Sequence, residues 1–484
     1  MFTLLLGINY AFNLLLIIIM IFFERREPVY IFAWMLPLLF LPLVGTLLYL
    51  VFGNGLKFKK RKNFNLKKQW DELYKESILK QKPKSLKIPG GKEELCKPIM
   101  IFNLNANKSL VTTHNEVTIY TNGKDKFNAL FEDLRQAKET IHILYYTFRI
   151  DEVGSELISI LEKKAEEGVE VRVVYDDIGS LHTTRNSFKD LIAKGGKVYP
   201  FFASKWRKIG SHINYRNHRK IVVIDGMVAY TGGMNIGAEY MSKDPKLSPW
   251  RDTHIRLEGE SAQMLQIRFL QDFGYASHEP IDDTGVQQKF RTFFPKKDWS
   301  HLRKQYVQIV SSGPDTDGEE LKSAFIKMIY TAKESIDIQT PYFVPDAAFL
   351  EAIKTAAHSD IRIRLMLPSI NDNRFVDRIN TSFMKELMEC GVDIYLYDGF
   401  VHAKTMTIDQ CMTTIGTSNL DIRSFQLNFE VNAFIYNVET AKEMTEIFER
   451  DLQHSRRATL EDEDLKKWYI RFEESLYRLL SLVL

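Results

Sequence analysis

The chain has 484 residues, of which 45% are hydrophobic, and its 65 Lys and Arg residues nearly balance 62 Asp and Glu residues. This composition excludes disordered and fibrous classes and indicates a globular protein with an extensive core. The formal net charge of +3 is too small to indicate nucleic-acid binding, which needs a clearly basic domain or stripe. Three scattered cysteines are too few for a disulfide framework or a four-cysteine zinc site, and favour a reducing compartment.

Two uncharged apolar runs open the chain, residues 1–23 and residues 28–52. Each run is long enough to cross a bilayer, which takes about 20 apolar residues. A signal peptide is the alternative for the first run, but this run lacks a basic beginning and a small-residue cleavage site. Pro37 and Pro42 are costly in a soluble helix but are tolerated in membrane helices. The pattern predicts a two-helix transmembrane hairpin over residues 1–56.

Basic residues follow the second apolar run: Lys57, Lys59, Lys60, Arg61, Lys62, Lys67 and Lys68. The loop between the two runs has only Arg25 and Arg26, so the positive-inside rule places the rest of this multi-pass protein in the cytoplasm. The basic cluster would also attract anionic lipid headgroups, although a topology signal alone is the alternative. Residues 57–115 are interpreted as a basic juxtamembrane linker, in which residues 66–79 form an amphipathic helix on the membrane or against the body.

The remainder of the chain is a tandem repeat, in which AKETIHI at residues 137–143 matches AKESIDI at residues 332–338. Helices and short β-branched runs alternate in both halves, which indicates two α/β sandwich domains. The predicted elements are helix 127–138, strand 141–145, helix 156–167 and strand 169–175, and then helix 320–332, strand 335–339, helix 347–357 and strand 361–367. The predicted domains are residues 116–258 and 306–484, joined by a connector at 259–305, and the second ends in an amphipathic helix at 468–484.

One motif, H-x-K-x4-D, occurs near the end of each half. Its two copies are His218, Lys220 and Asp225, and His402, Lys404 and Asp409. Each copy is followed by a small-residue turn and an asparagine 17 residues after the histidine, at Asn235 and Asn419. Two copies in register with matching asparagines make coincidence a poor explanation.

The spacing within the motif has a geometric meaning. Residues two apart on a strand share a face, so His218 projects beside Lys220 and His402 beside Lys404. Both aspartates of the candidate catalytic set come at a turn, off that face, and are assigned a structural or orienting role. A returning strand would bring each asparagine back near the imidazole, where its amide can bind a phosphate.

These residue types suit phosphodiester chemistry. Attack on a phosphodiester needs a nucleophile, a proton donor for the leaving alkoxide, and donors around the non-bridging oxygens. One imidazole supplies the first need and the other imidazole the second, and the lysines and asparagines supply the third. We find no carboxylate cluster with convincing metal-binding spacing, and no P-loop, G-x-S-x-G or H-E-x-x-H motif.

The duplicated motifs and their asparagines resemble the phospholipase D superfamily, and the two N-terminal apolar runs make the chain similar to the bacterial cardiolipin synthases of that superfamily. The resemblance covers nearly the whole chain and includes WRDTH at residues 250–254 and TPYFVPD at residues 340–346. It implies a pseudo-twofold pair of phospholipase D-like α/β sandwich domains that share one active site, anchored in the bacterial cell membrane.

The reaction that the resemblance implies condenses two phosphatidylglycerol molecules into cardiolipin and glycerol, through a phosphohistidine and without a metal or other cofactor. It favours His218 as the nucleophile and His402 as the acid and base. It also implies a carboxylate behind each histidine, at Asp252 and Glu430, which would fix the tautomer of the ring. An insertion at residues 241–249 precedes Asp252, so surface charge is the alternative for that residue. The implied partners are phosphatidylglycerol and anionic membrane lipids, and not nucleic acid.

Three other functions remain open. A phospholipase D-type hydrolase would use the same motifs with water as the acceptor. A membrane-anchored nuclease would need a basic footprint that the charge balance lacks. A non-catalytic membrane scaffold would usually have an eroded motif, whereas both copies here are complete.

Overall fold

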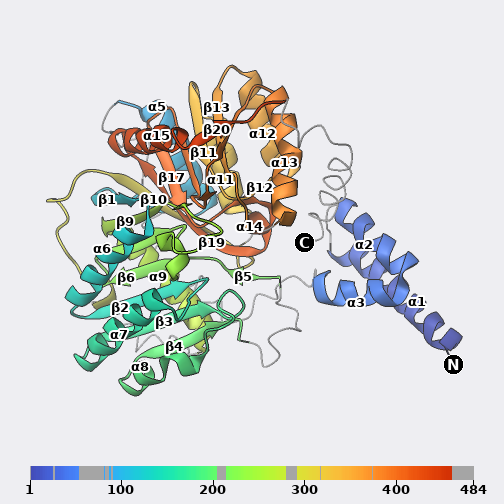
Figure 1. The fold of residues 1–484 in the computed structure, drawn as a ribbon, viewed down its shortest axis with the longest axis horizontal. Helices are drawn as coiled ribbons and strands as arrows, with labels where there is room; N and C mark the ends of the chain where they lie inside the picture. The colour runs from blue at the N-terminus through green and yellow to red at the C-terminus, as the bar shows by residue number, and fades with distance from the viewer. Residues whose placement is uncertain are drawn as a thin grey trace.

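A computed structural model describes residues 2–24, 28–53, 81, 87–88, 91–203, 214–278, 292–316, 318–372 and 374–460. The described chain consists of three apolar N-terminal helices and a larger α/β body (Figure 1). The basic cluster at residues 57–68 and the predicted amphipathic helices at 66–79 and 468–484 lie outside the described residues.

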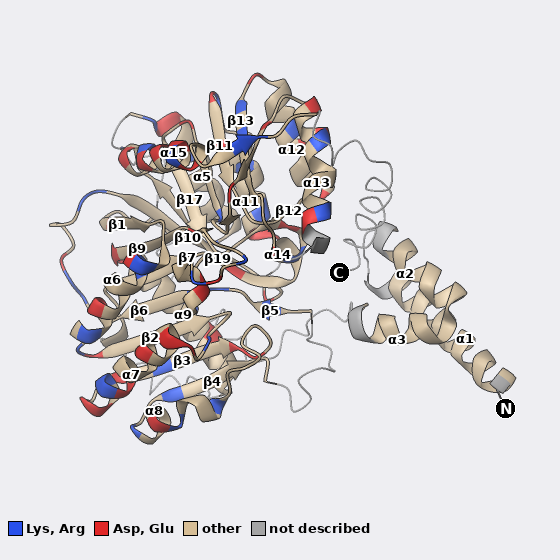
Figure 2. Ribbon diagram, viewed as in Figure 1, with Lys and Arg blue, Asp and Glu red and all other residues tan. Residues whose placement is uncertain are grey.

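The N-terminal runs form α1 (Phe2–Ile19, continued by a π-helical turn at Met20–Glu24), α2 (Pro28–Phe40) and α3 (Pro42–Phe52). Among the described residues, one helix, Thr3–Phe22, is long and apolar enough to cross a membrane, whereas Ile31–Phe40 is apolar but shorter. The second run therefore differs from the single helix predicted by the sequence, because it breaks at Leu41, directly before Pro42. Figure 2 shows charged residues over the outer helices of the body and none on α1, α2 or α3.

The break in the second run is stabilised by α1. Proline has no backbone N–H, so Pro42 leaves the carbonyl oxygen of Leu38 without its helical donor. The buried Asn13 replaces that donor, since its Nδ2 donates to Leu38 O at 2.9 Å and to Pro42 O at 3.0 Å. The hydroxyl of Thr46 on α3 donates in turn to Asn13 Oδ1 at 2.5 Å. Because unsatisfied backbone groups are costly in apolar surroundings, this network holds the three helices together.

The first half of the body is a seven-stranded sheet in the order β1-β9-β7-β6-β2-β3-β4. The β2, β3 and β4 strands run parallel and the other neighbours antiparallel. Its strands and helices are β1 (Asn115–Tyr120), α6 (Gly123–Gln136), β2 (Thr140–Tyr145), α7 (Glu152–Glu166), β3 (Glu170–Asp176), α8 (Lys189–Ala193), β4 (Lys197–Phe201), β6 (Ile221–Ile224), β7 (Val228–Gly232) and β9 (His254–Gly259).

The second half repeats this order strand by strand, as β10-β19-β17-β16-β11-β13-β14, with β20 added at the edge. Its elements are β10 (Tyr306–Ser312), α11 (Glu320–Ile329), β11 (Ser335–Gln339), β12 (Phe343–Val344), α12 (Ala347–His358), β13 (Arg362–Pro368), α13 (Arg374–Glu389), β14 (Asp393–Tyr397), β16 (Thr405–Ile408), β17 (Met412–Gly416), β18 (Leu420–Asp421), α14 (Ile422–Gln426), β19 (Asn428–Tyr436), α15 (Val438–Leu452) and β20 (Ser455–Arg457). The predicted alternation is confirmed. Helices α6 and α7 begin four residues earlier than predicted, where Asn122 and Asp151 cap them.

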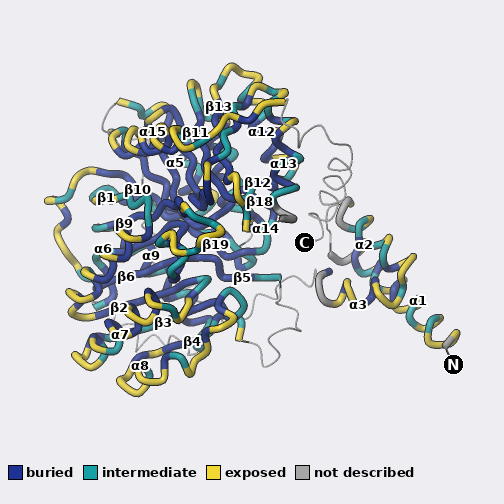
Figure 3. Tube along the Cα trace, viewed as in Figure 1, coloured by how far each residue is buried: buried dark blue, intermediate teal, exposed yellow. Residues whose placement is uncertain are grey.

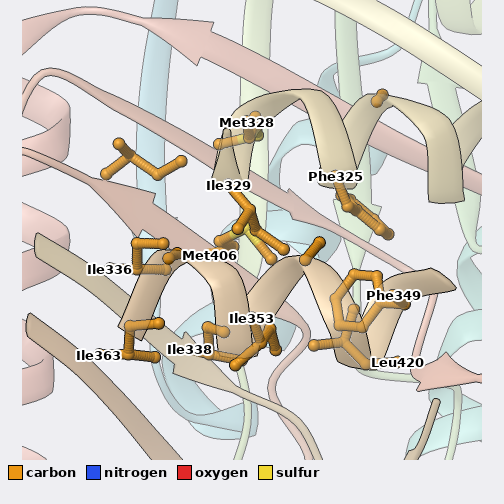
Figure 4. Close-up of a cluster of buried hydrophobic side chains, with 14 of the residues drawn as sticks. Phe325, Met328, Ile329, Ile336, Ile338, Phe349, Ile353, Ile363, Met406 and Leu420 are labelled. Atoms are coloured by element: carbon orange, nitrogen blue, oxygen red, sulfur yellow. The ribbon is translucent and has the colours of Figure 1, made fainter. Parts of the chain in front are cut away.

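The two sheets share an apolar core. Residues such as Ile221 and Val223 of the first sheet pack with Ile415 and Val431 of the second and with α9 (Glu260–Ser277). The outer faces are covered by α6, α7 and α8 in one half and by α11, α12 and α13 in the other. Figure 3 shows buried strands between helices whose outer surfaces are exposed, and Figure 4 shows α11 and α12 packed over β11. The apolar core that the two sheets share with α9 holds the two halves against each other.

Two segments that the sequence assigns to connections belong to this body. Helix α5 (Glu93–Ala106) lies in the predicted linker, yet Cys96, Ile99 and Met100 are buried in the core of the second half. Helix α9 lies in the predicted connector, yet Leu265 and Phe269 are buried between the halves. Both segments therefore contribute to the packing of the two domains.

Candidate active site

Two short strand pairs cross between the halves and bring the two motifs together. The β5 strand (Arg216–Asn217) pairs in parallel with the start of β19, and β15 (Phe400–Val401) pairs in parallel with β8 (Trp250–Arg251). The backbone N–H of His218 then donates to Phe429 O at 3.0 Å, and that of His402 donates to Arg251 O at 2.6 Å. Each histidine therefore lies beside a strand of the opposite half.

This pairing gives each histidine a carboxylate from the other half. Nδ1 of His218 donates to Glu430 Oε1 at 2.8 Å, and Nδ1 of His402 donates to Asp252 Oδ2 at 2.7 Å. Both carboxylates are fully buried. Since an ionised carboxylate only accepts, the contact places the proton on Nδ1 and leaves the Nε2 lone pair available. The insertion before Asp252 does not move this residue away from His402. Asp252 directly follows the two residues that pair with β15, just as Glu430 directly follows the two residues that pair with β5.

The electrostatics of the site favour neutral imidazoles. Burial lowers the pKa of His218 to about 4, with Glu430 opposing and Lys220 adding to the shift. Burial likewise lowers the pKa of His402 to about 3, with Lys404 adding to the shift and Asp252 opposing it. A neutral imidazole with a free Nε2 is the form that can attack phosphorus.

The two lysines lie behind the histidines. Nζ of Lys220 donates to His218 O at 2.8 Å, and Nζ of Lys404 donates to His402 O at 2.6 Å. Burial lowers the pKa of Lys220 to about 7 and that of Lys404 to about 8, while the nearby carboxylates oppose both shifts. An anion bound between the histidines would favour the charged form of both lysines.

Both asparagines reach the same cavity as the histidines. The strand pairs β6–β7 and β16–β17 return the chain to this point. Oδ1 of Asn235 accepts from the N–H of Thr147 at 3.1 Å, and its Nδ2 donates to the hydroxyl of Tyr240. Asn419 is also buried, and its Oδ1 has no hydrogen-bond partner within the described part of the chain.

The two aspartates of the motif lie at the far end of their strands. Asp225 accepts from the backbone N–H groups of residues 138, 139 and 140 at 2.8–3.0 Å, and Asp409 accepts from those of residues 333, 334 and 335 at 2.8–2.9 Å. These are the residues of the AKET and AKES repeat. Each aspartate thus fixes the loop that enters the first strand of its half, without contacting either histidine.

A cavity of about 550 Å³ lies between the halves, and its wall includes both histidines and both asparagines. The ring of Tyr146 lies 4.8 Å from that of His218, and the ring of Trp250 lies 5.3 Å from that of His402. Arg216 and Arg423 also line this cavity. The sequence interpretation assigned none of these four residues to the site, although Trp250 belongs to the WRDTH segment that supports the resemblance. Arg216 stands two positions before His218, and Trp250 stands two positions before Asp252. On a strand this spacing places two side chains on the same face, so it could have indicated both residues.

Two buried arginines donate hydrogen bonds to the backbone of the two carboxylate residues that bind the histidines. Arg219 and Arg251 each donate to the backbone carbonyl oxygen of one of these two carboxylate residues. Arg219 also donates to both carboxylate oxygens of Asp272 on α9 at 2.9 Å. Arg251 donates from Nε to Asp451 on α15 at 2.9 Å. Helices α9 and α15 follow the equivalent strands β9 and β19, but the two arginines are not equivalent. Arg219 follows His218, where the second half has Ala403, and Arg251 precedes Asp252, where the second half has Phe429.

The described residues contain no group of three or more His, Cys, Asp or Glu side chains placed to hold a metal ion. Independence from metals stays a prediction, because only an activity measurement can test it.

Two tandem α/β domains that each give one histidine motif to a shared cavity define a phospholipase D-like protein. Residues 130–245 and 325–452 match the family model described as "Cardiolipin synthase, PLD-like domain", and residues 11–54 match "Phospholipase D-nuclease N-terminal". The chain belongs to the cardiolipin synthase family of the phospholipase D superfamily.

Two cardiolipin synthases are similar to nearly the whole chain. The major cardiolipin synthase ClsA of Bacillus subtilis is 42% identical, with 100% of this chain and 99% of that protein aligned. The cardiolipin synthase of Listeria innocua is 41% identical, with 98% and 97% aligned. Among solved structures, phosphatidylserine synthase of Haemophilus influenzae has a TM-score of 0.59 at 15% identity, over 80% of this chain and 100% of that chain, which shows the fold.

Proposed function

We propose that this protein is a membrane-bound phosphatidyltransferase that condenses two phosphatidylglycerol molecules into cardiolipin and glycerol. The observation that carries the proposal is the pair of buried histidines in one cavity, each held through Nδ1 by a carboxylate of the opposite half. The names of the full-length relatives support the choice of reaction.

In the first step, Nε2 of His218 attacks the phosphorus of one phosphatidylglycerol. The P–O bond to the headgroup glycerol breaks as the P–N bond forms, and His402 gives its proton to the departing oxygen. Burial lowers the pKa of His402 to about 3, so its imidazole is neutral before a substrate binds. The negative charge of the incoming phosphodiester raises that pKa, so that His402 takes up a proton as the substrate binds.

In the second step, a headgroup hydroxyl of another phosphatidylglycerol attacks the phosphohistidine. His402, now neutral, accepts the hydroxyl proton while the new P–O bond forms and the P–N bond breaks. Glu430 stabilises the His218 ring in its substituted, positively charged form. Lys220, Lys404 and the amides of Asn235 and Asn419 would compensate the charge on the non-bridging oxygens, and no metal is required.

The domain division and the membrane topology belong to the same proposal. The N-terminal unit is residues 1–56, the linker 57–115, the first domain 116–258, the connector 259–305 and the second domain 306–484. Spans at about 1–23 and 28–52 would form a hairpin with the catalytic domains in the cytoplasm, because basic residues crowd the end of the second span. The hydrogen bonds of Asn13 support the hairpin, since they satisfy the carbonyl oxygens of Leu38 and Pro42 where the second run breaks.

The purified full-length protein, incubated with phosphatidylglycerol vesicles, tests the function directly. Cardiolipin and glycerol in equal amounts are the expected products. Phosphatidic acid and glycerol would instead assign a hydrolase, and the absence of any product would overturn the proposal. Dialysis against EDTA is expected to leave the rate unchanged, and a rate that returned only with a divalent ion would contradict the metal-free mechanism.

A further inference from the structure

The cavity is built from equivalent backbone segments, but its two ends differ in side-chain chemistry. The residues two positions before the histidines are Arg216 and Phe400. In the strand register, Arg216 of β5 lies opposite Asn428 of β19, and Phe400 of β15 lies opposite Trp250 of β8. Of these four residues, Arg216 and Asn428 line the cavity near His218 and Trp250 lines it near His402, so only the end near His218 has a cation at this position.

A second pair of equivalent positions differs in the same direction. Four residues after the asparagines of the motif stand Glu239 in the first half and Arg423 in the second. Both side chains line the cavity. Glu239 is paired with Arg149, with Oε1 2.8 Å from Nε. The end of the cavity near His402 thus has an acidic residue where the other end has an arginine.

Arg216 and Arg423 lie against one stretch of backbone. Nη2 of Arg423 donates to Asn214 O at 3.3 Å, and Nη1 of Arg216 donates to Tyr215 O at 2.6 Å. Arg216 is buried, and both side chains line the cavity beside His218. Two guanidinium groups held close together in a partly desolvated wall form a strong site for a phosphate group.

The proposed reaction needs such a second anion site. Cardiolipin has two phosphodiesters joined by one glycerol, and the histidines act on only one of them at a time. The acceptor lipid already has the other phosphodiester, a three-carbon bridge away from its attacking hydroxyl. Both phosphates must therefore fit in one cavity, and the second one adds a negative charge that the histidines, lysines and asparagines at the reacting phosphorus do not balance.

We infer that Arg216 and Arg423 bind the phosphodiester of the acceptor phosphatidylglycerol while its headgroup hydroxyl attacks the phosphohistidine. This inference rests on the proposed function. The hydroxyl oxygen forms the new P–O bond, the P–N bond breaks, and the hydroxyl proton passes to the acid–base histidine. The arginines bond to oxygens that do not react, so they select which alcohol is used and take no part in forming the phosphohistidine.

Glycerol exchange separates this site from the reaction centre. Phosphatidylglycerol mixed with radiolabelled glycerol becomes labelled through the same phosphohistidine, but the acceptor there has no phosphate. In Arg423→Gln, the ratio of cardiolipin formed to glycerol exchanged is expected to fall about 10- to 100-fold, as for the loss of a charged hydrogen bond. Arg423→Lys keeps the charge without the planar fork and is expected to give an intermediate ratio.

Arg149→Gln is the matched control, because Arg149 lines the same cavity but pairs with Glu239. Its ratio is expected to match that of the wild type. The inference would be overturned if Arg423→Gln kept the wild-type ratio, whether both activities stayed the same or both fell equally. It would also be overturned if the ratio fell as much in Arg149→Gln as in Arg423→Gln. A wild-type protein that neither makes cardiolipin nor exchanges glycerol would overturn the proposed function itself.

Discussion

The two halves of the body place the same motif in different surroundings. Strand order, the aspartate at the strand end and the lysine-to-carbonyl bond are the same in both halves. The carboxylate behind the histidine is Glu430 on one side and Asp252 on the other, and Thr417 donates its hydroxyl to Glu430 whereas Asp252 accepts from the N–H of Thr253. A duplicated backbone supplies two similar imidazoles, and the side chains around them allow the two to act differently.

Removing either imidazole is the strongest way to test that difference. His218→Ala and His402→Ala should each lower cardiolipin formation by at least about 10³-fold, since one loses the nucleophile and the other the acid and base. With phosphatidylglycerol radiolabelled at its phosphate, His402→Ala should still become covalently labelled, and His218→Ala should not. Membrane fractionation and the melting temperature are the controls for folding. The reverse labelling pattern would exchange the two roles.

The buried arginines Arg219 and Arg251, which pair with one aspartate in each half, give the next largest expected effect. In Arg251→Met, Asp451 keeps only the amide of Gln339 as a described side-chain donor, so the free energy of unfolding should fall by about 3–5 kcal/mol. In Arg219→Met, Asp272 still pairs with Arg268, so the fall should be smaller. Thermal unfolding in detergent measures both changes. Equal shifts would show that Arg268 does not compensate.

The two carboxylates should differ by the step they affect. Asp252→Asn and Glu430→Gln should each slow cardiolipin formation on the order of 10²-fold, because the imidazole loses the group that orients it and stabilises its charged form. A phosphatidyl ester with p-nitrophenol as its leaving group needs no proton donor. Release of p-nitrophenol in the first turnover, before the phosphohistidine reacts with an acceptor, should therefore be largely restored in Asp252→Asn and stay slow in Glu430→Gln. Equal behaviour of the two variants would contradict separate roles.

The lysines give the smallest expected effect, which is a pH dependence. Each ammonium is charged below its pKa, of about 7 for Lys220 and about 8 for Lys404, whereas His218 is neutral above about 4. Because His402 must also take up its proton as the substrate binds, the value of kcat/KM should fall gradually as the pH rises from about 5 to 7 and more steeply above about 7, where the lysines lose their charge. Lys220→Arg keeps its charge, so in any activity that it retains the steeper fall should begin at higher pH. A level profile up to pH 9 in the wild type would contradict a need for charged lysines.

Much of the fold could be predicted from local patterns. The AKET and AKES repeat and the alternating helices and strands predict two similar α/β units, and the structure has one strand order used twice. The apolar N-terminal runs are equally clear, but the break at Leu41 is not, because Pro37 and Pro42 are both compatible with a continuous helix in a membrane. Asn13, 25 residues before Leu38, stabilises the break, and no local pattern reveals that bond.

The sequence by itself determined which residue types form the candidate site, because the spacing of His218, Lys220 and Asn235 and its repetition in the second half depend only on neighbouring positions along strands and turns. Only the tertiary structure decided which carboxylate meets which histidine and which side chains line the cavity. Those contacts form where β5 pairs with β19 and β15 with β8. Their register depends on how two complete sheets pack, which no local sequence pattern specifies.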